Sequence, residues 1–194
     1  DPTAGMRLLA SVWLEQALSD VMRIDLRYLP RLYRLWLGGS MPSGLFDSRP
    51  LARLIGYRIP WRQLARNLRS QRVQALTVSA TNVRTGRSTL YVDRARGIEL
   101  AVQATHILPQ HVLASAAMPL VFPPVRIGND YFCDGGIRLN TPTAPAIQMG
   151  VDRMFVIGVT TPRRETSIPM GHTPGASFLL GKALDALMLD HIEH

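Results

Sequence analysis

Residues 132–142 read FCDGGIRLNTP and place one carboxylate between a strand-like apolar run and two consecutive glycines. Asp134 has two interpretations. Asp-Gly is a common turn dipeptide, because Asp accepts hydrogen bonds from nearby amides and Gly adopts positive φ. Alternatively, a strand at 131–133 delivers the carboxylate to a sheet edge, where Gly135 and Gly136 let another backbone approach closely. These residues by themselves favour the turn. The sequence on either side is needed to distinguish a turn residue from a functional carboxylate.

The pattern around this stretch alternates helices with strands. Apolar residues recur at helical spacing near the N-terminus, and prolines begin several later helical segments. Alternating apolar and polar residues flank turns at Gly86 and Gly128, which predicts two hairpins. We expect helices over 2–22, 30–37, 50–55, 60–69, 106–118, 144–149 and 178–188, and strands over 73–83, 88–92, 125–133 and 154–159. This order, with 154–159 continuously apolar, predicts an α/β fold with a largely parallel sheet in a single domain over 1–194.

Composition excludes several classes of protein. The chain has 194 residues, 46% of them hydrophobic, which is enough to form a core. No apolar run approaches the length of a membrane-spanning helix. A single cysteine, Cys133, excludes an internal disulfide and a cysteine-based zinc site. The net charge is +8, yet almost all basic residues are Arg, which favours a compositional bias over nucleic-acid binding and suggests a bacterial origin.

A set of motifs follows in a fixed order along the chain. Small residues at 115–117 lead to Met118-Pro119, then to a Phe-Pro-Pro turn at 122–124 and the DGG of 134–136. Next comes an Asn-x-Pro at Asn140 and Pro142, which is followed by a short predicted helix. A Gly-x-Asp at Gly150 and Asp152 then leads to the apolar strand predicted at 154–159. The stretch 114–159 closely resembles the patatin-like phospholipases, and segments 43–55 and 76–91 resemble the family upstream.

The resemblance implies a three-layer α/β fold with a mainly parallel central sheet flanked by helices. It implies a lipid acyl hydrolase of the phospholipase or lysophospholipase type, working through a Ser-Asp dyad without a cofactor. Asp134 inherits the role of general base, and Gly135 and Gly136 support the site. Burial is expected to raise the pKa of such a base.

The nucleophile motif of the family is not found in this sequence. Patatin-like proteins place their serine in a GxSxG elbow after a strand, with an oxyanion hole in a Gly-rich loop. The nearest match, GGSMP at 38–42, has proline for the last glycine and follows a predicted helix. We therefore expect a domain that is incomplete at its N-terminal side, and a 194-residue chain that is inactive by itself. The alternative is a non-catalytic lipid-binding or regulatory module that keeps the fold.

Three other features are candidate sites. Cys133 and Asp134 should point to opposite faces of a strand, so Cys133 is expected to be a buried apolar residue rather than a nucleophile. His191 and His194 lack a third ligand, and we assign no metal. The helix at 27–36 has arginines on one side, which suits a membrane surface, but packing on the protein's own core is favoured. A cytoplasmic or peripheral membrane location is expected, with a phospholipid or other acyl ester as substrate.

Overall fold

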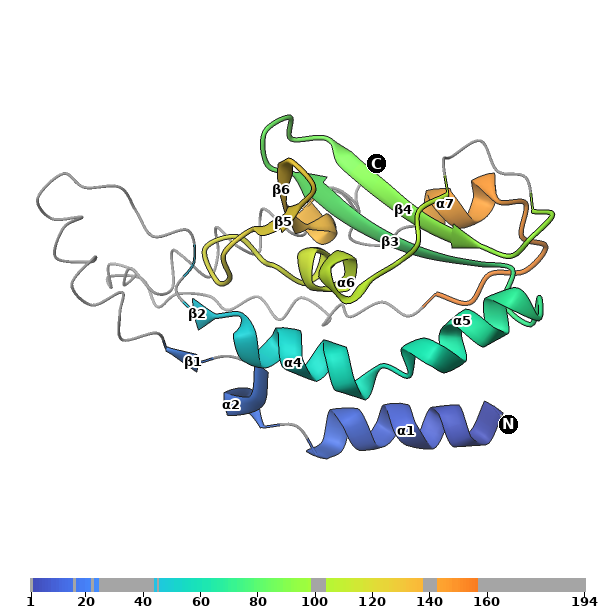
Figure 1. Cartoon of the computed structure of the whole chain (residues 1–194), viewed down its shortest axis with the longest axis horizontal. Helices are drawn as coiled ribbons and strands as arrows, with labels where there is room; N and C mark the ends of the chain where they lie inside the picture. The colour runs from blue at the N-terminus through green and yellow to red at the C-terminus, as the bar shows by residue number, and fades with distance from the viewer. Residues whose placement is uncertain are drawn as a thin grey trace, which may run out of the picture. The chain divides into compact units, whose positions relative to one another are not determined.

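The computed structural model describes residues 2–15, 17–21, 23–24, 44, 46–98, 104–137 and 143–156 (Figure 1). Two compact units divide the chain, one over 1–135 and one over 136–194. Several features predicted from the sequence lie outside the described residues. They are the helices at 30–37 and 178–188, the basic helix at 27–36, the GGSMP loop and both C-terminal histidines.

The N-terminal helix is shorter than predicted. Helix α1 spans Pro2–Glu15 and α2 spans Leu18–Val21, where the sequence predicts one helix over 2–22. Asp20 accounts for the start of the second helix, because its carboxylate accepts the Ala17 N–H at 3.1 Å while its own N–H bonds to the Ala17 carbonyl at 2.9 Å. Such reciprocal bonds begin a new helix and compete with continuation of the old one.

Two proline-started helices follow, as the sequence predicts. Helix α4 spans Arg49–Arg58 and α5 spans Trp61–Arg69. They are separated at Ile59, which is extended (φ −78°, ψ 123°) because the next residue is proline. The Trp61 indole donates a hydrogen bond to the Ile55 carbonyl at 3.1 Å, which fixes the start of α5 against α4.

The main sheet has four strands in the order β4-β3-β6-β5. Its members are β3 (Ala75–Asn82), β4 (Ser88–Arg94), β5 (Val125–Ile127) and β6 (Asp130–Asp134). Both predicted hairpins are present, turning at Gly86 (φ 65°) and Gly128 (φ 62°), where glycine permits the positive φ. Separately, β1 (Arg23–Ile24) pairs with β2 (Phe46–Asp47).

The expectation of a largely parallel sheet is wrong for the described strands, all of which pair antiparallel. Tight turns can join only antiparallel neighbours, and both hairpins here use such turns. Parallel pairing among the described residues is confined to two isolated bridges, Gly44 with Leu120 and Val92 with Ala104. In the predicted strand 154–159, residues 154–156 form no strand and are exposed, and the rest lies outside the described part.

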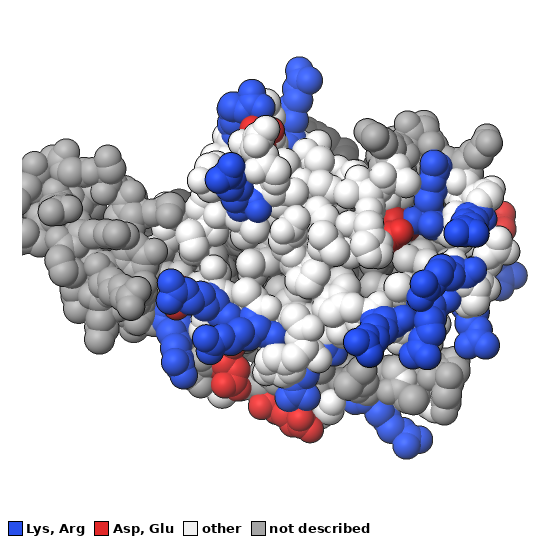
Figure 2. Space-filling view, viewed as in Figure 1, with Lys and Arg blue, Asp and Glu red and all other residues white. Residues whose placement is uncertain are grey.

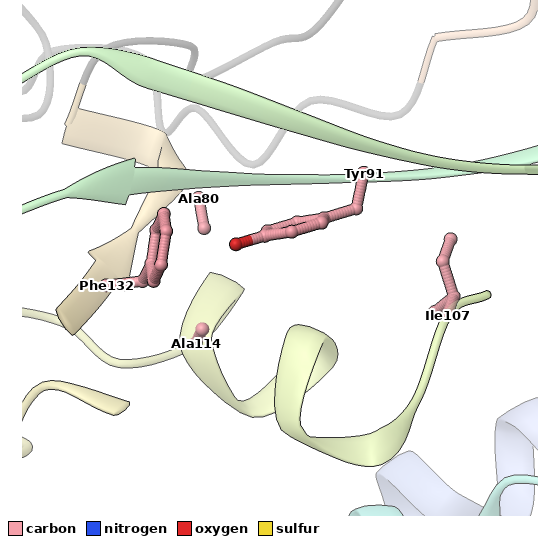
Figure 3. Packing of buried hydrophobic residues seen from close by; sticks show 5 residues of the cluster. All are labelled: Ala80, Tyr91, Ile107, Ala114 and Phe132. Atoms are coloured by element: carbon pink, nitrogen blue, oxygen red, sulfur yellow. The ribbon is translucent and has the colours of Figure 1, made fainter. Parts of the chain in front are cut away.

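Helix α6 (Pro109–Ser115) covers one face of this sheet and forms the core with it (Figures 1 and 3). Ala80 of β3 and Ala114 of α6 have no exposed surface, and such small side chains let helix and sheet approach closely. Tyr91 and Phe132 meet edge to face, with ring centroids 5.8 Å apart. The sequence predicts this helix within 106–118, beginning near Pro109, and the start is confirmed. Its early end at Ser115 leaves 116–118 outside the helix.

The unit 136–194 is described over a short part. Helix α7 spans Thr143–Gln148, close to the predicted 144–149, and Gly150 follows it at φ 71°. That conformation is the usual helix-ending role of glycine. Nowhere in the described ranges is a helix both long and apolar enough to cross a membrane.

Candidate functional site

Asp134 is the last residue of β6, and its place in the sheet is set by β3. The register pairs Asp134 with Ala80, Cys133 with Thr81 and Phe132 with Asn82. Phe132 is buried in the core, whereas Asp134 is half-buried at the end of the strand. The sequence expectation of a carboxylate at a strand end therefore matches the geometry of β6.

The backbone of Asp134 is held from two sides. Its N–H donates to the Ala117 carbonyl at 2.9 Å, and its own carbonyl accepts the Thr81 hydroxyl at 3.0 Å. Thr81 and Ala117 are both buried. Because both partners are packed in the interior, they hold the main chain that carries this carboxylate in place.

Position 135 requires glycine, because the backbone there passes very close to Ser79 of β3. A Cβ built on Gly135 would lie 2.5 Å from both the carbonyl oxygen and the hydroxyl oxygen of Ser79. No side chain fits there without moving the strand. Gly136 follows in the short 3₁₀ helix η2 (Gly135–Ile137) and is half-buried.

The turn that bonds Asp134 contains a strained residue. Leu120 has φ 68°, a conformation that a branched apolar side chain rarely adopts. Gly44 packs against the same turn, since a Cβ added to it would clash with the Phe122 carbonyl carbon and the Pro123 nitrogen. The Phe46 N–H also donates to the Val121 carbonyl at 2.9 Å. Backbone held in this way accumulates near functional positions.

Sequence reasoning does not assign Thr81, Ala117, Gly44 or Leu120 to the site. The small residues at 115–117 form part of a motif, and Gly44 falls inside a segment that resembles the family, but neither pattern gives them a role. No sequence pattern identifies Thr81. The alternation of apolar and polar residues in β3 predicts which face of the sheet Thr81 lies on, but not which residue of β6 it pairs with.

Cys133 is unsuited to nucleophilic chemistry. Its Sγ lies 3.7 Å from the Thr81 carbonyl oxygen, in hydrogen-bond contact. Burial raises the pKa of the Cys133 thiol, and the neighbouring Asp134 charge adds to this effect. Since the thiolate is the reactive form, a raised pKa makes this cysteine a weaker nucleophile than a free thiol.

His106 precedes α6, and His111 lies within it. His106 Nδ1 lies 2.7 Å from an Asp93 carboxylate oxygen, and this oxygen also accepts the Ile107 N–H at 3.2 Å. The buried His111 accepts the Leu108 N–H on Nδ1 at 2.9 Å and packs against the Tyr91 ring. Burial lowers the pKa of His111, and the nearby His106 adds to this. His111 therefore caps the start of α6 through Nδ1 and takes up a proton less readily than a free histidine.

No metal-binding group of three or more His, Cys, Asp or Glu side chains occurs in the described part of the chain. Of the other motif positions, Gly150 ends α7 and Asp152 is exposed, whereas 138–142, which includes Asn140 and Pro142, lies outside the described ranges.

The described site is therefore a single carboxylate at the end of a central strand. It is fixed through its main chain and backed by a glycine that admits the neighbouring strand. A carboxylate so placed can accept a proton from a hydroxyl brought to it.

Comparison with known proteins gives one family. The family model described as patatin-like phospholipase matches residues 3–147 of the 194. No curated protein matches the chain.

Proposed function

Because the chain belongs to the patatin-like phospholipase family, whose members act on lipid substrates, we propose that it forms part of a lipid acyl hydrolase in which Asp134 is the general base. The proposed substrates are phospholipids or lysophospholipids. The reaction is carboxylic ester hydrolysis by a Ser-Asp dyad, and no cofactor is needed for it.

In the proposed reaction, a serine hydroxyl oxygen attacks the ester carbonyl carbon and its proton passes to the Asp134 carboxylate. The tetrahedral intermediate collapses, the alcohol leaves with that proton, and an acyl-serine remains. Asp134 then takes a proton from water, which attacks the acyl-serine; the fatty acid is released as the same proton passes to the serine oxygen. Each step uses the same carboxylate first as base and then as acid.

One observation carries the proposal beyond family membership. Asp134 stands at the end of β6 with both of its backbone polar groups bonded to buried neighbours, Ala117 and Thr81. A base on a fixed main chain keeps its position as a proton moves, which favours catalysis. The close contact of Gly135 with Ser79 supports the same placement.

The proposal assigns the nucleophile to polypeptide outside these 194 residues. The sequence contains no GxSxG, which is the motif that presents the nucleophilic serine on a turn after a strand. The oxyanion hole of the family is assigned to the same missing polypeptide.

The role of Asp134 is tested in the full-length protein with Asp134→Asn, which keeps the shape of the side chain and removes the base. We expect kcat for a phospholipid to fall by about 10²- to 10⁴-fold. Unaltered turnover in folded Asp134→Asn would exclude this residue as the base.

Asp130→Asn is the matched control, because it makes the same chemical change at the other end of the same strand. It alters an ion pair with the exposed Arg84 and a hydrogen bond from Asn82. This variant should keep kcat within about twofold, because such surface pairs contribute little.

The 194-residue chain by itself provides a second test. Loss of the nucleophile costs on the order of a million-fold in serine hydrolases, so we expect no ester turnover above background. Turnover by the isolated chain that depends on Asp134 would contradict the placement of the serine elsewhere.

A second candidate is favoured by the same missing motif. A lipid-binding or regulatory module would keep the fold and lack the serine. Labelling of the full-length protein by a fluorophosphonate probe separates the two, because this reagent reacts with an activated serine. Labelling supports the hydrolase, and lipid binding without labelling supports the module.

A further inference from the structure

The positive charge of the chain is concentrated in one segment. Residues 48–92 contain nine of the 22 basic residues and none of the 14 acidic ones. Their net charge is thus +9, whereas the remaining 13 basic and 14 acidic residues give −1. A uniform compositional bias towards arginine does not produce such a division, so the bias interpretation of the charge is insufficient.

Most of these arginines lie on two neighbouring helices and project into solvent. Arg49 and Arg53 of α4 are exposed, and so are Arg62, Arg66 and Arg69 of α5. In α5 the three arginines recur at intervals of four and three residues, which places them on one face. In the lower part of Figure 2, basic side chains lie in a group towards the left and a group towards the right, with uncharged surface between them and acidic side chains below the left group. We call the exposed arginines of residues 49–72 the arginine face; they are Arg49, Arg53, Arg62, Arg66, Arg69 and Arg72.

The opposite side of α5 is fixed to the protein. Leu68 is buried, and the half-buried Trp61 packs against the core cluster and bonds to the Ile55 carbonyl. The helix therefore cannot rotate its arginines inwards without breaking these contacts. The α5 part of the arginine face is therefore held at the surface of the folded protein.

Few of these arginines are neutralised within the protein. Arg49 lies 3.9 Å from the Asp47 carboxylate, at the outer limit of an ion pair. For Arg53, Arg62, Arg66, Arg69 and Arg72, no carboxylate among the described residues lies within ion-pair distance. Like charges on one face repel one another, which a surface rich in anions would relieve.

We propose that the arginine face binds the phosphate groups of an anionic membrane and holds the protein against its lipid substrate. This inference rests on the proposed function. Guanidinium groups bind phosphate oxygens in a two-pronged geometry, and a planar array of headgroups offers several at once. Tyr57, at the end of α4, is 67% exposed and lies beside Arg58, whose guanidinium carbon is 5.9 Å from the ring centroid. An exposed tyrosine among arginines suits the boundary between headgroups and acyl chains.

Nucleic acid is the other polyanion that such a surface fits, and the observations favour it less. Proteins that follow a nucleic-acid strand interleave basic residues with several exposed aromatic rings on which bases stack. Within α4 and α5 only Tyr57 presents an exposed ring, because Trp61 is turned towards the core.

The test is co-sedimentation of the protein with vesicles of phosphatidylcholine containing about one third phosphatidylserine, compared with phosphatidylcholine alone. We expect binding to the anionic vesicles only, weakening steeply as salt is raised. Each arginine at an anionic surface strengthens binding by about fivefold, so Arg62→Gln with Arg66→Gln should weaken it about 25-fold.

The matched control is Arg87→Gln with Arg126→Gln, which removes the same charge from exposed positions in the hairpin turn after β3 and in β5. It should lose less than about threefold, because these positions lie outside the arginine face. Equal loss in both double variants would overturn the proposal, since net charge alone would then explain binding. Full binding by the Arg62/Arg66 variant, or tighter binding to duplex DNA than to the vesicles, would also overturn it.

Two variants separate the proposed membrane contact from the proposed catalytic role of Asp134. Asp134→Asn should bind vesicles like the unmodified protein, because this residue is not on the arginine face. In the full-length protein, the Arg62/Arg66 variant should hydrolyse a soluble short-chain ester at the normal rate while losing activity on anionic vesicles. Equal loss on both substrates would overturn the docking role without affecting the role of Asp134.

Discussion

At the scale of single residues, the geometry around Asp134 depends on the small size of its neighbour. The φ angle of Gly135 is one that any residue can adopt. Glycine is needed at this position only because there is no room for a Cβ. The strand β3 passes so close that the Ser79 oxygens occupy the position of a side chain. Gly44 is in the same situation against Phe122 and Pro123.

Replacing Gly135 with Ala should therefore destabilise the protein. The added methyl would clash with main-chain atoms of Ser79, and such overpacking costs about 1–3 kcal/mol in the free energy of unfolding. Urea unfolding followed by circular dichroism measures this.

Gly56→Ala is the matched control, because it adds the same methyl in α4 with no atom within 4 Å. It should raise the free energy of unfolding by about 0.5–1 kcal/mol, as alanine favours the helix. Equal stability of the two variants would contradict the close contact at Gly135.

At the scale of elements, β3 is the organising strand. It pairs with β4 on one side and β6 on the other, while α6 packs across the same sheet (Figure 3). The position of Asp134 follows from its pairing with Ala80, so displacement of β3 would move the carboxylate. The neighbouring strand β4 carries Val92, the largest fully buried side chain in the described core.

Val92→Ala should destabilise the sheet by about 2 kcal/mol, through loss of buried surface and formation of a cavity. Val83, which follows β3, is 50% exposed, and Val83→Ala should change the free energy of unfolding by less than about 0.5 kcal/mol. Thermal or urea unfolding of both variants provides the comparison. A small effect at Val92 would show that the core is packed differently around β4.

At the scale of the whole molecule, charge is distributed unevenly and the interior contains a titratable group. The segment 48–92 carries the entire positive excess, and the face it forms is the basis of the proposed membrane contact. His111, buried against Tyr91, links the stability of the fold to pH. Its other titratable neighbour is His106, which pairs with Asp93.

The lowered pKa of His111 predicts lower stability in acid. The folded state binds the proton less readily than the unfolded chain, whose histidine titrates near 6.5. The contribution of His111 is thus fully present above that pH and is lost as the pH falls through the lowered pKa of the folded state.

His111→Asn keeps an acceptor for the Leu108 N–H and does not titrate in this range, so it isolates the effect. We expect stability to fall less in this variant than in the unmodified protein between about pH 7.5 and pH 5, measured as unfolding midpoints in urea. An identical pH dependence in both proteins would show that protonation of His111 is not coupled to unfolding.

The sequence by itself determined the local elements and the family. Turn glycines at 86 and 128 fixed both hairpins, and prolines at 50, 60 and 109 marked the starts of three helices, because these signals act through neighbouring residues. The ordered motifs predicted the patatin-like family and singled out Asp134.

Only the tertiary structure decided how these elements meet. The antiparallel order β4-β3-β6-β5, the bonds from Thr81 and Ala117 to Asp134, and the contact of Gly135 with Ser79 are examples. Thr81 and Asp134 are more than 50 positions apart, so nothing local in either segment specifies their pairing. Burial of apolar side chains away from water selects the strand register, because only one register buries the apolar faces of the strands. That register brings the distant residues into contact.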